Sequence, residues 1–345
     1  MVKKILQAVG FGVFCAILIL FVAPQVNNKL NFNQNTKIVS YHHAVKIAAP
    51  AVVNIYNQSF DLASDNNGLQ VSSLGSGVIM TSSGYILTNR HVIDNADQII
   101  VALQSGTIYE ATLVGSDILT DLAVLSIDAE NLPTIPQNPH RPYQIGDVVL
   151  AIGNPFNLGQ SITQGIVSAT ERNALSEGGR QNFIQIDASI NKGNSGGALI
   201  NTAGELIGIN TLSLGKNASD IAEGLNFAIP ISLANKVMTK IIRDGRVIRG
   251  YFGVGTELFY SAKQLGVGDR GVVVTSVSEN GPAARAGVKT NDVILQIGDI
   301  EAETPRQIMG AIADMKPDTN VKVLVLRQGK EILLNVTIGE FPEIK

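Results

Sequence analysis

The chain has 345 residues, enough for two folded domains, because compact domains usually take about 100 to 200 residues. Hydrophobic residues make up 45% of it, and 34 glycines without any tryptophan indicate a β-rich globular protein rather than a disordered chain. The formal net charge is only -3, and no dense run of Lys and Arg interleaved with aromatic residues occurs. Nucleic acid is therefore excluded as a partner.

A long apolar segment lies close to the N-terminus. Lys3 and Lys4 precede residues 5–23, in which Gln7 is the only strongly polar side chain. As a helix this run is about 28 Å long, close to the ~30 Å hydrocarbon core of a bilayer. Two lysines before the run and no comparable cluster after it favour a cytoplasmic N-terminus, with everything downstream outside the inner membrane. We expect residues 1–24 to form a cytoplasmic stub and a transmembrane anchor.

A cleaved signal peptide is the alternative explanation of this segment. Pro24 directly follows the apolar run, and no Ala-x-Ala cleavage site with a permissive next residue is present, which favours a retained anchor. Cys15, the single cysteine, lies inside the run, so the exported part contains no disulfide. Packing in the membrane is favoured over lipid attachment for Cys15, because Gly12 stands where a larger apolar residue is expected.

Beyond the anchor, the sequence changes character twice. Residues 25–38 are rich in asparagine and glutamine without any helical or strand period, which predicts a polar linker. From residue 39 onward, short apolar segments alternate with Gly, Asn, Asp and Ser turns, as in antiparallel β-barrels. A first barrel is predicted from the segments 51–55, 77–80, 85–87, 99–103 and 123–127. A second barrel is predicted from the segments 148–152, 165–169, 183–186, 197–200, 206–209 and 226–229.

The first long helical pattern follows the second barrel. We expect Ser232 to cap this helix and Gly245 to stand just past its end. Apolar residues recur in it at fourfold spacing, at positions 233, 237 and 241. A boundary here closes a domain of residues 39–245.

Residues 246–345 read as a second, smaller domain. Predicted strands at 272–274, 293–295 and 321–326 alternate with short helices at 283–286 and 305–315. The pattern predicts a small α/β unit of about a hundred residues.

The Gly-Asn-Ser-Gly-Gly sequence at residues 193–197 has the composition of a nucleophile turn. A nucleophilic serine needs an exposed hydroxyl on a tight turn whose backbone N–H groups converge, and glycines permit such a turn. If Ser195 attacks a peptide carbonyl, the amides of Gly193 and Ser195 form the oxyanion hole, and each donor typically contributes about 3 to 4 kcal/mol. The alternative is an ordinary glycine-rich turn, since short motifs match by chance.

Of the four histidines, His91 has the position expected of a general base, just after a predicted strand. A neutral imidazole can take the serine proton and return it to the leaving amine. His42 and His43 precede the barrels and His140 lies in a proline-rich connection, so we expect these three at the surface. No His-Glu-x-x-His motif or second ligand cluster accompanies His91, and no calcium, nucleotide or redox cofactor motif occurs. The sequence therefore predicts no metal and no cofactor.

Asp121 stands immediately before an apolar strand, where it can orient a catalytic imidazole. A turn aspartate that merely starts a strand is the alternative, because aspartate is common in turns. The chain order His91, Asp121, Ser195, with the first two in barrel one, is that of chymotrypsin-type proteases rather than of subtilisins or α/β-hydrolases. The sequence therefore predicts a mostly β, double-barrel serine endopeptidase that works through an acyl-enzyme.

Four motifs resemble signatures of the HtrA/Deg family of serine proteases. They lie at residues 88–92 (TNRHV), 121–125 (DLAVL), 152–156 (IGNPF) and 193–197 (GNSGG). The resemblance covers the chain from about residue 40 to its end. One membrane span, one protease domain, one PDZ domain and a short first loop, here residues 58–69, are typical of the family's membrane-anchored stress-sensor branch.

The resemblance implies a homotrimer in the bacterial periplasm, anchored in the inner membrane by its N-terminal helix. It also implies that C-termini of misfolded outer-membrane proteins bind the PDZ domain, and that the protease then cleaves a membrane-bound anti-sigma factor to start regulated proteolysis. Small apolar residues such as valine are the expected preference before the cut. Ile190 and residues 212–221 are expected to shape that pocket.

The resemblance further assigns the C-terminal unit to a PDZ domain. Tyr251, Phe252, Gly253 and Val254 match its carboxylate-binding loop, whose backbone amides hold a peptide terminus while the peptide pairs as an added strand. Asn291 stands where the family usually has glycine, and this departure affects a turn rather than the site.

Two further features of the resemblance have alternative explanations. Ile308, Ile312 and Met315 either line the peptide groove or pack in the core, as their helical spacing also permits. Arg172, in an expected sensor loop at residues 171–180, matches an arginine that holds the active conformation in the family. The alternative for Arg172 is a solvated charge on a mobile loop.

Other functions are compatible with parts of the sequence. A general quality-control protease and chaperone would normally have a cleavable signal, a long first loop and two PDZ domains, and none of these features is found. An inactive PDZ scaffold does not require His91, Asp121 and Ser195, yet all three are intact. A resting enzyme whose oxyanion loop forms only when peptide binds is also compatible with these residues.

Overall fold

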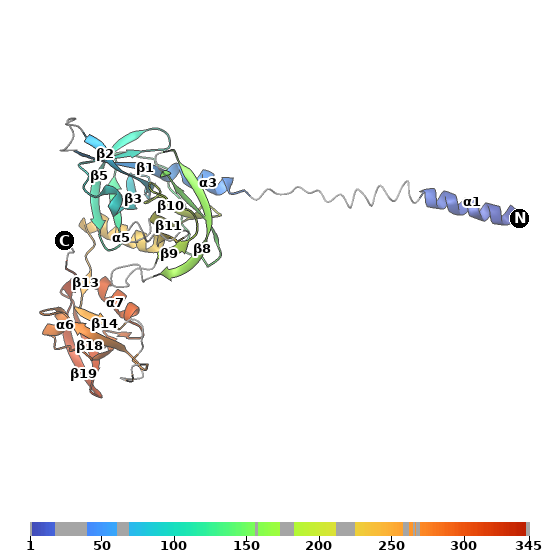
Figure 1. Ribbon diagram of the computed structural model, residues 1–345. Helices are drawn as coiled ribbons and strands as arrows, with labels where there is room; N and C mark the ends of the chain where they lie inside the picture. Colours follow the sequence, from blue (N-terminus) through green and yellow to red (C-terminus); the bar gives the residue numbers. More distant parts are fainter. Residues whose placement is uncertain are drawn as a thin grey trace. The chain divides into compact units, whose positions relative to one another are not determined.

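The computed structural model (Figure 1) describes residues 2–17, 40–60, 69–155, 158–172, 183–211, 225–257, 262–264, 266 and 270–342. The chain divides into two compact units, Met1–Tyr41 and His42–Lys345. In the first unit, helix α1 spans Val2–Ile17. No helix in the described ranges combines the length and the hydrophobicity that a membrane crossing requires. The end of the expected span and the whole expected linker fall within residues 18–39, which lie outside the described residues.

The second unit begins with helix α3 (His42–Ala48), the 3-10 turn η2 (Ala49–Ala51) and a closed antiparallel barrel. Around this barrel the strands are β1 (Val52–Phe60), β2 (Leu69–Ile79), β3 (Tyr85–Asn89), β6 (Leu122–Ser126), β5 (Ile108–Asp117) and β4 (Gln98–Ala102). The sequence predicts all of these except β5. That strand buries only Ala111 and Asp117, so it shows neither an apolar run nor a regular alternation.

A second closed barrel follows, and with it the mostly β, double-barrel fold is confirmed. Around it the strands are β10 (Ala198–Asn201), β11 (Leu206–Thr211), β12 (Asn226–Pro230), β9 (Phe183–Ile186), β8 (Ser161–Arg172) and β7 (Val148–Gly153). All six correspond to predicted segments. Their inward side chains form one buried cluster that includes Val149, Ile184, Ile186 and Leu199.

Helix α5 (Ile231–Asp244) leaves the second barrel without a side-chain cap, so the expectation for Ser232 is wrong. Strand β12 runs directly into the helix, Pro230 occupies the N-cap position, and Ser232 already lies in the first turn. Gly245 ends the helix as expected, in the left-handed conformation at φ 72 with its N–H bonded to the Ile241 carbonyl. The helix lies close to barrel one, where a Cβ on Gly115 would approach the Gly245 oxygen to 2.0 Å.

The C-terminal part of the chain forms a small sheet with two helices. Its strands run in the order β14 (Val254–Thr256), β15 (Val272–Val277), β16 (Val293–Ile297), β18 (Asn320–Arg327) and β19 (Lys330–Thr337). Strand β17 (Ile300–Glu301) pairs with β16, and β13 (Gly250–Tyr251) pairs with β20 (Gly339–Glu340). The helices are α6 (Pro282–Arg285) and α7 (Pro305–Asp314), both within a residue of their predicted bounds.

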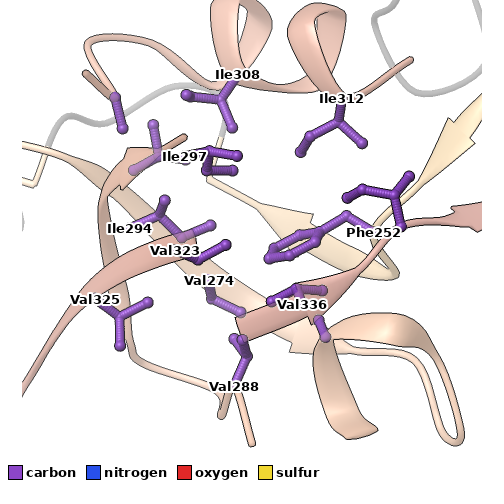
Figure 2. Close-up of a cluster of buried hydrophobic side chains, with 14 residues drawn as sticks. Phe252, Val274, Val288, Ile294, Ile297, Ile308, Ile312, Val323, Val325 and Val336 are labelled. Carbon is purple, nitrogen blue, oxygen red and sulfur yellow. The ribbon is translucent and has the colours of Figure 1, made fainter. Parts of the chain in front are cut away.

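The core of this sheet places several residues that the sequence singled out (Figure 2). Phe252 is 2% exposed and lies among the side chains of α7 and the sheet. Ile308 and Ile312 are fully buried in the same cluster, and Met315 packs against it partly buried. Asn291 adopts a left-handed φ of 70, a conformation that glycine and asparagine tolerate best, which explains why asparagine can stand at this turn.

Candidate active site

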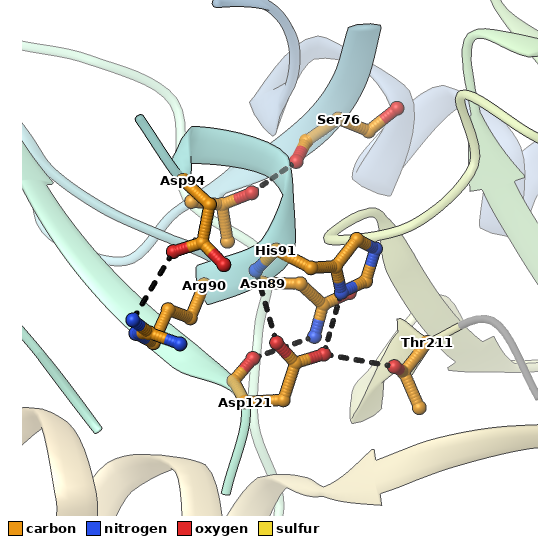
Figure 3. Close-up of polar contacts among 8 residues, drawn as sticks. Ser76, Asn89, Arg90, His91, Asp94, Asp121 and Thr211 are labelled. Atoms are coloured by element: carbon orange, nitrogen blue, oxygen red, sulfur yellow. Dashed lines mark hydrogen bonds and ion pairs between the residues drawn. The ribbon is translucent and has the colours of Figure 1, made fainter. Parts of the chain in front are cut away.

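His91 and Asp121 are brought together by the pairing of two strands in barrel one (Figure 3). Strand β3 ends at Asn89, which pairs with Leu122 at the start of β6. His91 follows β3 in the short helix α4 (Arg90–Ile93), and Asp121 directly precedes β6. The imidazole Nδ1 lies 2.6 Å from Asp121 Oδ2, and the His91 backbone N–H donates to Oδ1 at 3.0 Å.

The backbone of Asp121 is held in an uncommon conformation. Its φ is 53, in the left-handed region that aspartate tolerates better than most side chains. Its carbonyl accepts hydrogen bonds from the Arg90 backbone N–H at 2.9 Å and from the Asn89 side-chain amide at 3.0 Å. These two bonds aim the carboxylate at His91. Asn89 is fully buried, and its place in the motif at residues 88–92 gives no indication of this role.

Thr211, at the end of β11 in barrel two, also contacts this carboxylate. Its hydroxyl donates to Asp121 Oδ2 at 3.4 Å. An ionised carboxylate only accepts hydrogen bonds, so the Nδ1 of His91 carries the proton in the bond to Asp121. The Nε2 atom is then free to take a proton, as a general base requires.

Ser195 sits on a turn whose glycines are required by geometry. Gly193 and Gly196 have φ values of 105 and 82, which L side chains rarely adopt. A Cβ on Gly196 would also lie 2.2 Å from the Ser76 carbonyl oxygen. The Gly196 amide donates to the Asn210 carbonyl at 2.8 Å, which fixes the turn to strand β11.

His91 is hydrogen-bonded to Asp121 in the structure, but Ser195 is not hydrogen-bonded to His91. Ser195 is 2% exposed, so the exposed hydroxyl expected from the sequence is not observed, and its Oγ has no hydrogen-bond partner among the described residues. In serine proteases the bond from nucleophile to base is often long without substrate and tightens in the reacting complex. His91 and Asp121 thus lie on barrel one, and Ser195 lies on a separate turn of barrel two.

Other residues considered in the sequence lie away from this pair or outside the described residues. His42, His43 and His140 are exposed. Arg172 is the last residue of β8 and pairs through its backbone with Phe183, whereas the rest of the expected sensor loop, from residue 173, is outside the description. Ile190 is 8% exposed within the core of barrel two. Residues 212–221, expected to shape the substrate pocket, lie outside the described residues.

The expected carboxylate-binding loop of the PDZ sheet lies beside a strand that, in the described part of the chain, stands at the end of the sheet. Strand β14 is the first strand of the sheet order and pairs with β15. Gly253, just before it, has φ 83. The buried Phe252 side chain points into the core, so this residue can offer a ligand only its backbone. Tyr251 is held by a hydrogen bond from its hydroxyl to Ser278 Oγ at 2.9 Å.

Two protein families match this chain. The trypsin-like peptidase domain matches residues 75–209, which contain His91, Asp121 and Ser195. The PDZ domain matches residues 250–338.

Individual proteins agree with these matches. Serine endoprotease DegS of Haemophilus influenzae is 58% identical over 345 residues, 99% of each chain. The crystal structure of the serine endoprotease from Yersinia pestis is 54% identical, covers 88% of this chain and 99% of its own, and superposes with a TM-score of 0.73. A structure of the HtrA-type protease AlgW with a tripeptide is 47% identical, with 88% and 98% coverage and a TM-score of 0.79. The resemblance seen in the four motifs is thus confirmed, and the chain belongs to the DegS serine endoproteases of the HtrA family.

Proposed function

We propose that His91, Asp121 and Ser195 carry out the endopeptidase reaction of this chain. Ser195 Oγ attacks the carbonyl carbon of the scissile peptide bond, and its proton passes to His91 Nε2. Asp121 holds the imidazole in the required tautomer and stabilises its positive charge. The observation that carries this assignment is the 2.6 Å bond between His91 Nδ1 and Asp121 Oδ2.

The oxyanion that forms is bound by the backbone amides of Gly193 and Ser195. When it collapses, His91 returns the proton to the leaving amine, the peptide C–N bond breaks, and an ester to Ser195 remains. Water, activated by the same imidazole, then hydrolyses the ester and restores the free hydroxyl. A Ser195→Ala variant is therefore expected to lose cleavage by at least about 10⁴-fold while it keeps its fold.

The PDZ domain is proposed to sense envelope stress by binding the C-termini of misfolded outer-membrane proteins. A peptide can add as a strand along the free edge of β14, with its carboxylate against the backbone amides of residues 251–254. The structure of the HtrA-type protease AlgW with a tripeptide supports this proposal. Binding would release the protease to cleave a membrane-bound anti-sigma factor, with Arg172 at the end of β8 carrying the signal toward the nucleophile turn.

The cellular setting follows the same proposal. Residues 1–24 anchor the chain in the inner membrane with a cytoplasmic N-terminus, and residues 25–38 link the anchor to the periplasmic part. The protease domain (39–245) and the PDZ domain (246–345) then assemble as a homotrimer. The apolar run at residues 5–23, preceded by Lys3 and Lys4, supports the anchor.

One assay tests the catalytic and sensor proposals together. Full-length protein in detergent is mixed with the periplasmic domain of an anti-sigma factor, with or without a peptide that ends in a free hydrophobic carboxylate. Wild type, Ser195→Ala and Arg172→Ala are compared. Cleavage that needs both Ser195 and the peptide, and that loses its peptide response in Arg172→Ala, supports the proposal. Peptide-independent cleavage contradicts the sensor role and favours quality control, whereas peptide binding without any cleavage favours a scaffold.

A further inference from the structure

Ser76 is not one of the three reacting residues, but it is hydrogen-bonded to the backbone of the turn that carries Ser195. It is in strand β2 of barrel one, opposite Asn54 of β1, and is fully buried. Its backbone N–H, its carbonyl and its hydroxyl all make hydrogen bonds, and three of these four bonds leave barrel one. A serine between two glycines on a barrel strand gives no sequence signal for such a role.

The hydroxyl of Ser76 joins two segments of barrel two. It donates to the Gly193 carbonyl at 2.7 Å and accepts the Asn154 backbone N–H at 3.0 Å. The direction of both bonds is fixed, because a carbonyl can only accept and a backbone N–H can only donate. The hydroxyl thereby ties the start of the nucleophile turn to the residue that follows β7.

The backbone of Ser76 holds the other side of the same turn. Its N–H donates to the Ser195 carbonyl at 2.8 Å. Its own carbonyl accepts the Thr88 hydroxyl at 2.7 Å, a bond within barrel one. The carbonyls of Gly193 and Ser195 are thus both fixed by one residue, and between them lies the peptide group whose N–H belongs to Ser195.

The position of Ser76 matters because peptide groups next to a glycine can rotate more easily than those next to other residues. Gly193, at φ 105, has no side chain to oppose rotation of its neighbouring peptide groups, and one rotated peptide would replace an oxyanion donor by an acceptor. The space is also tight, since a Cβ on Gly153 would lie 2.8 Å from the Asn194 Cα and 3.1 Å from Ser76 Oγ. A hydroxyl bond at this point selects one orientation of the turn.

We propose that Ser76 is a positioning residue that holds the Gly193–Ser195 turn in the orientation in which its amides can bind the oxyanion. It acts from barrel one, the barrel that also carries His91 and Asp121, and so couples the two halves of the site. The inference rests on the proposed function, because it takes Ser195 as the nucleophile. Ser76 itself touches neither substrate nor the proton that is transferred.

The test compares Ser76→Ala and Ser76→Cys with wild type in the full-length, peptide-activated enzyme. We expect Ser76→Ala to lower kcat about 10- to 100-fold, somewhat less than removal of an oxyanion donor itself. KM should stay within about twofold, and the pKa seen in the pH profile of kcat/KM should not move, because the His91–Asp121 bond is untouched. Labelling of Ser195 by a fluorophosphonate, in which an O–P bond forms and fluoride leaves, should slow in parallel.

The controls separate a positioning role from a loss of fold. Thr81 lies in the turn between β2 and β3, where its hydroxyl accepts the Tyr85 N–H at 3.1 Å. Thr81→Ala removes this hydroxyl and should leave kcat and labelling unchanged. Ser76→Cys keeps the size and a weak donor, so it covers the case in which the alanine variant does not fold, and its kcat should lie between those of alanine and wild type. A folded Ser76 variant with wild-type kcat and labelling rate overturns the inference. Activity that survives Ser195→Ala overturns the proposed function instead.

Discussion

Two aspartates in different regions of the chain occupy nearly the same local setting. Asp121 directly precedes β6 in barrel one, and Asp292 directly precedes β16 in the PDZ sheet. Both turns contain a left-handed residue, Asp121 itself at φ 53 and Asn291 at φ 70. In sequence, each aspartate stands immediately before an apolar strand.

The two carboxylates differ in the side chains to which they are bonded. The Asp121 side chain is 25% exposed and bonds a histidine that is 43% exposed. The Asp292 side chain is 1% exposed and receives Arg327 Nε and Nη2, each at 2.7 Å. A partner that can gain and lose a proton near solvent makes the first pair suitable for chemistry. A permanently charged guanidinium makes the second pair a structural tie.

The charge state of Asp292 follows from this setting. Burial raises the pKa of Asp292, but the hydrogen bonds from Arg327 and from the Lys289 backbone, with the positive charges of both residues, outweigh it. The net result is a pKa below the usual range of aspartate. The hydrogen bond to Asp292 likewise raises the pKa of Arg327. Both groups are therefore charged at neutral pH, and each stabilises the other.

The largest effect that distinguishes the two turns is expected from Asp121→Asn. The amide has nearly the same shape, so the fold should survive, but it no longer favours the tautomer with a proton on Nδ1. We expect kcat to fall by about 10⁴-fold with unchanged peptide binding to the PDZ domain. Steady-state cleavage and peptide-binding titration on the same preparation measure this. A loss below about tenfold would mean that Asp121 does not orient His91 for catalysis.

Asp292→Asn should change stability instead of chemistry. It leaves Arg327 without its charged partner, and the cost is about 2 to 4 kcal/mol, below that of a sealed pair because the Arg327 side chain is 24% exposed. Hydrogen exchange at the amides of β16 and β18 in the full-length protein should quicken correspondingly. Labelling of Ser195 by a fluorophosphonate should proceed at the wild-type rate. Slower labelling with unchanged hydrogen exchange would mean that Asp292 contributes to catalysis and not to the stability of the sheet.

The part of the site that could be predicted is the part with a specific local sequence. Residues around His91, Asp121 and Ser195 each form a short motif, and their order along the chain adds a constraint that no single motif has. The contribution of Thr211 could not be predicted, because a threonine that ends an apolar strand is common and its partner Asp121 is 90 residues away in the chain. Only closure of both barrels brings them together.

The helices and strands, too, could be predicted only where the local sequence has a clear pattern. The apolar strands of both barrels follow from burial patterns, whereas β5 is too exposed to show one. The cap expected at Ser232 fails for a local reason, since a good capping residue has no role when the chain enters the helix directly from Pro230. For Ile308 and Ile312, helical spacing fits a groove and a core equally well, and the packing of α7 on the sheet decides for the core.

The stability of the PDZ sheet should depend on pH through Asp292, and this smaller effect tests the structural role assigned to that residue. Because the pKa of Asp292 is lowered in the folded state, its stabilisation is fully present above the unfolded value of about 3.9. It is lost as the pH falls through the lower folded value. The difference in exchange protection between wild type and Asp292→Asn should therefore be constant from pH 7 down to about 4, and should shrink as the pH is lowered further, from about 4 toward the folded value. A difference that stays constant below about pH 4 as well would show that the charge of Asp292 is not the source of the stabilisation.

The smallest effect is expected from Thr211→Val, which removes one hydroxyl and keeps the side-chain shape. Its bond to Asp121 is long, at 3.4 Å, and Asp121 keeps both of its bonds to His91. A neutral hydrogen-bond donor of this kind contributes about 1 kcal/mol or less, so kcat should fall by no more than about fivefold. Thr239→Val removes a hydroxyl that bonds within helix α5, to the Asn235 carbonyl at 2.8 Å, and should leave kcat unchanged. A fall in the Thr211 variant as large as that of Asp121→Asn would mean that barrel two, and not the turn before β6 alone, decides how the carboxylate is aimed.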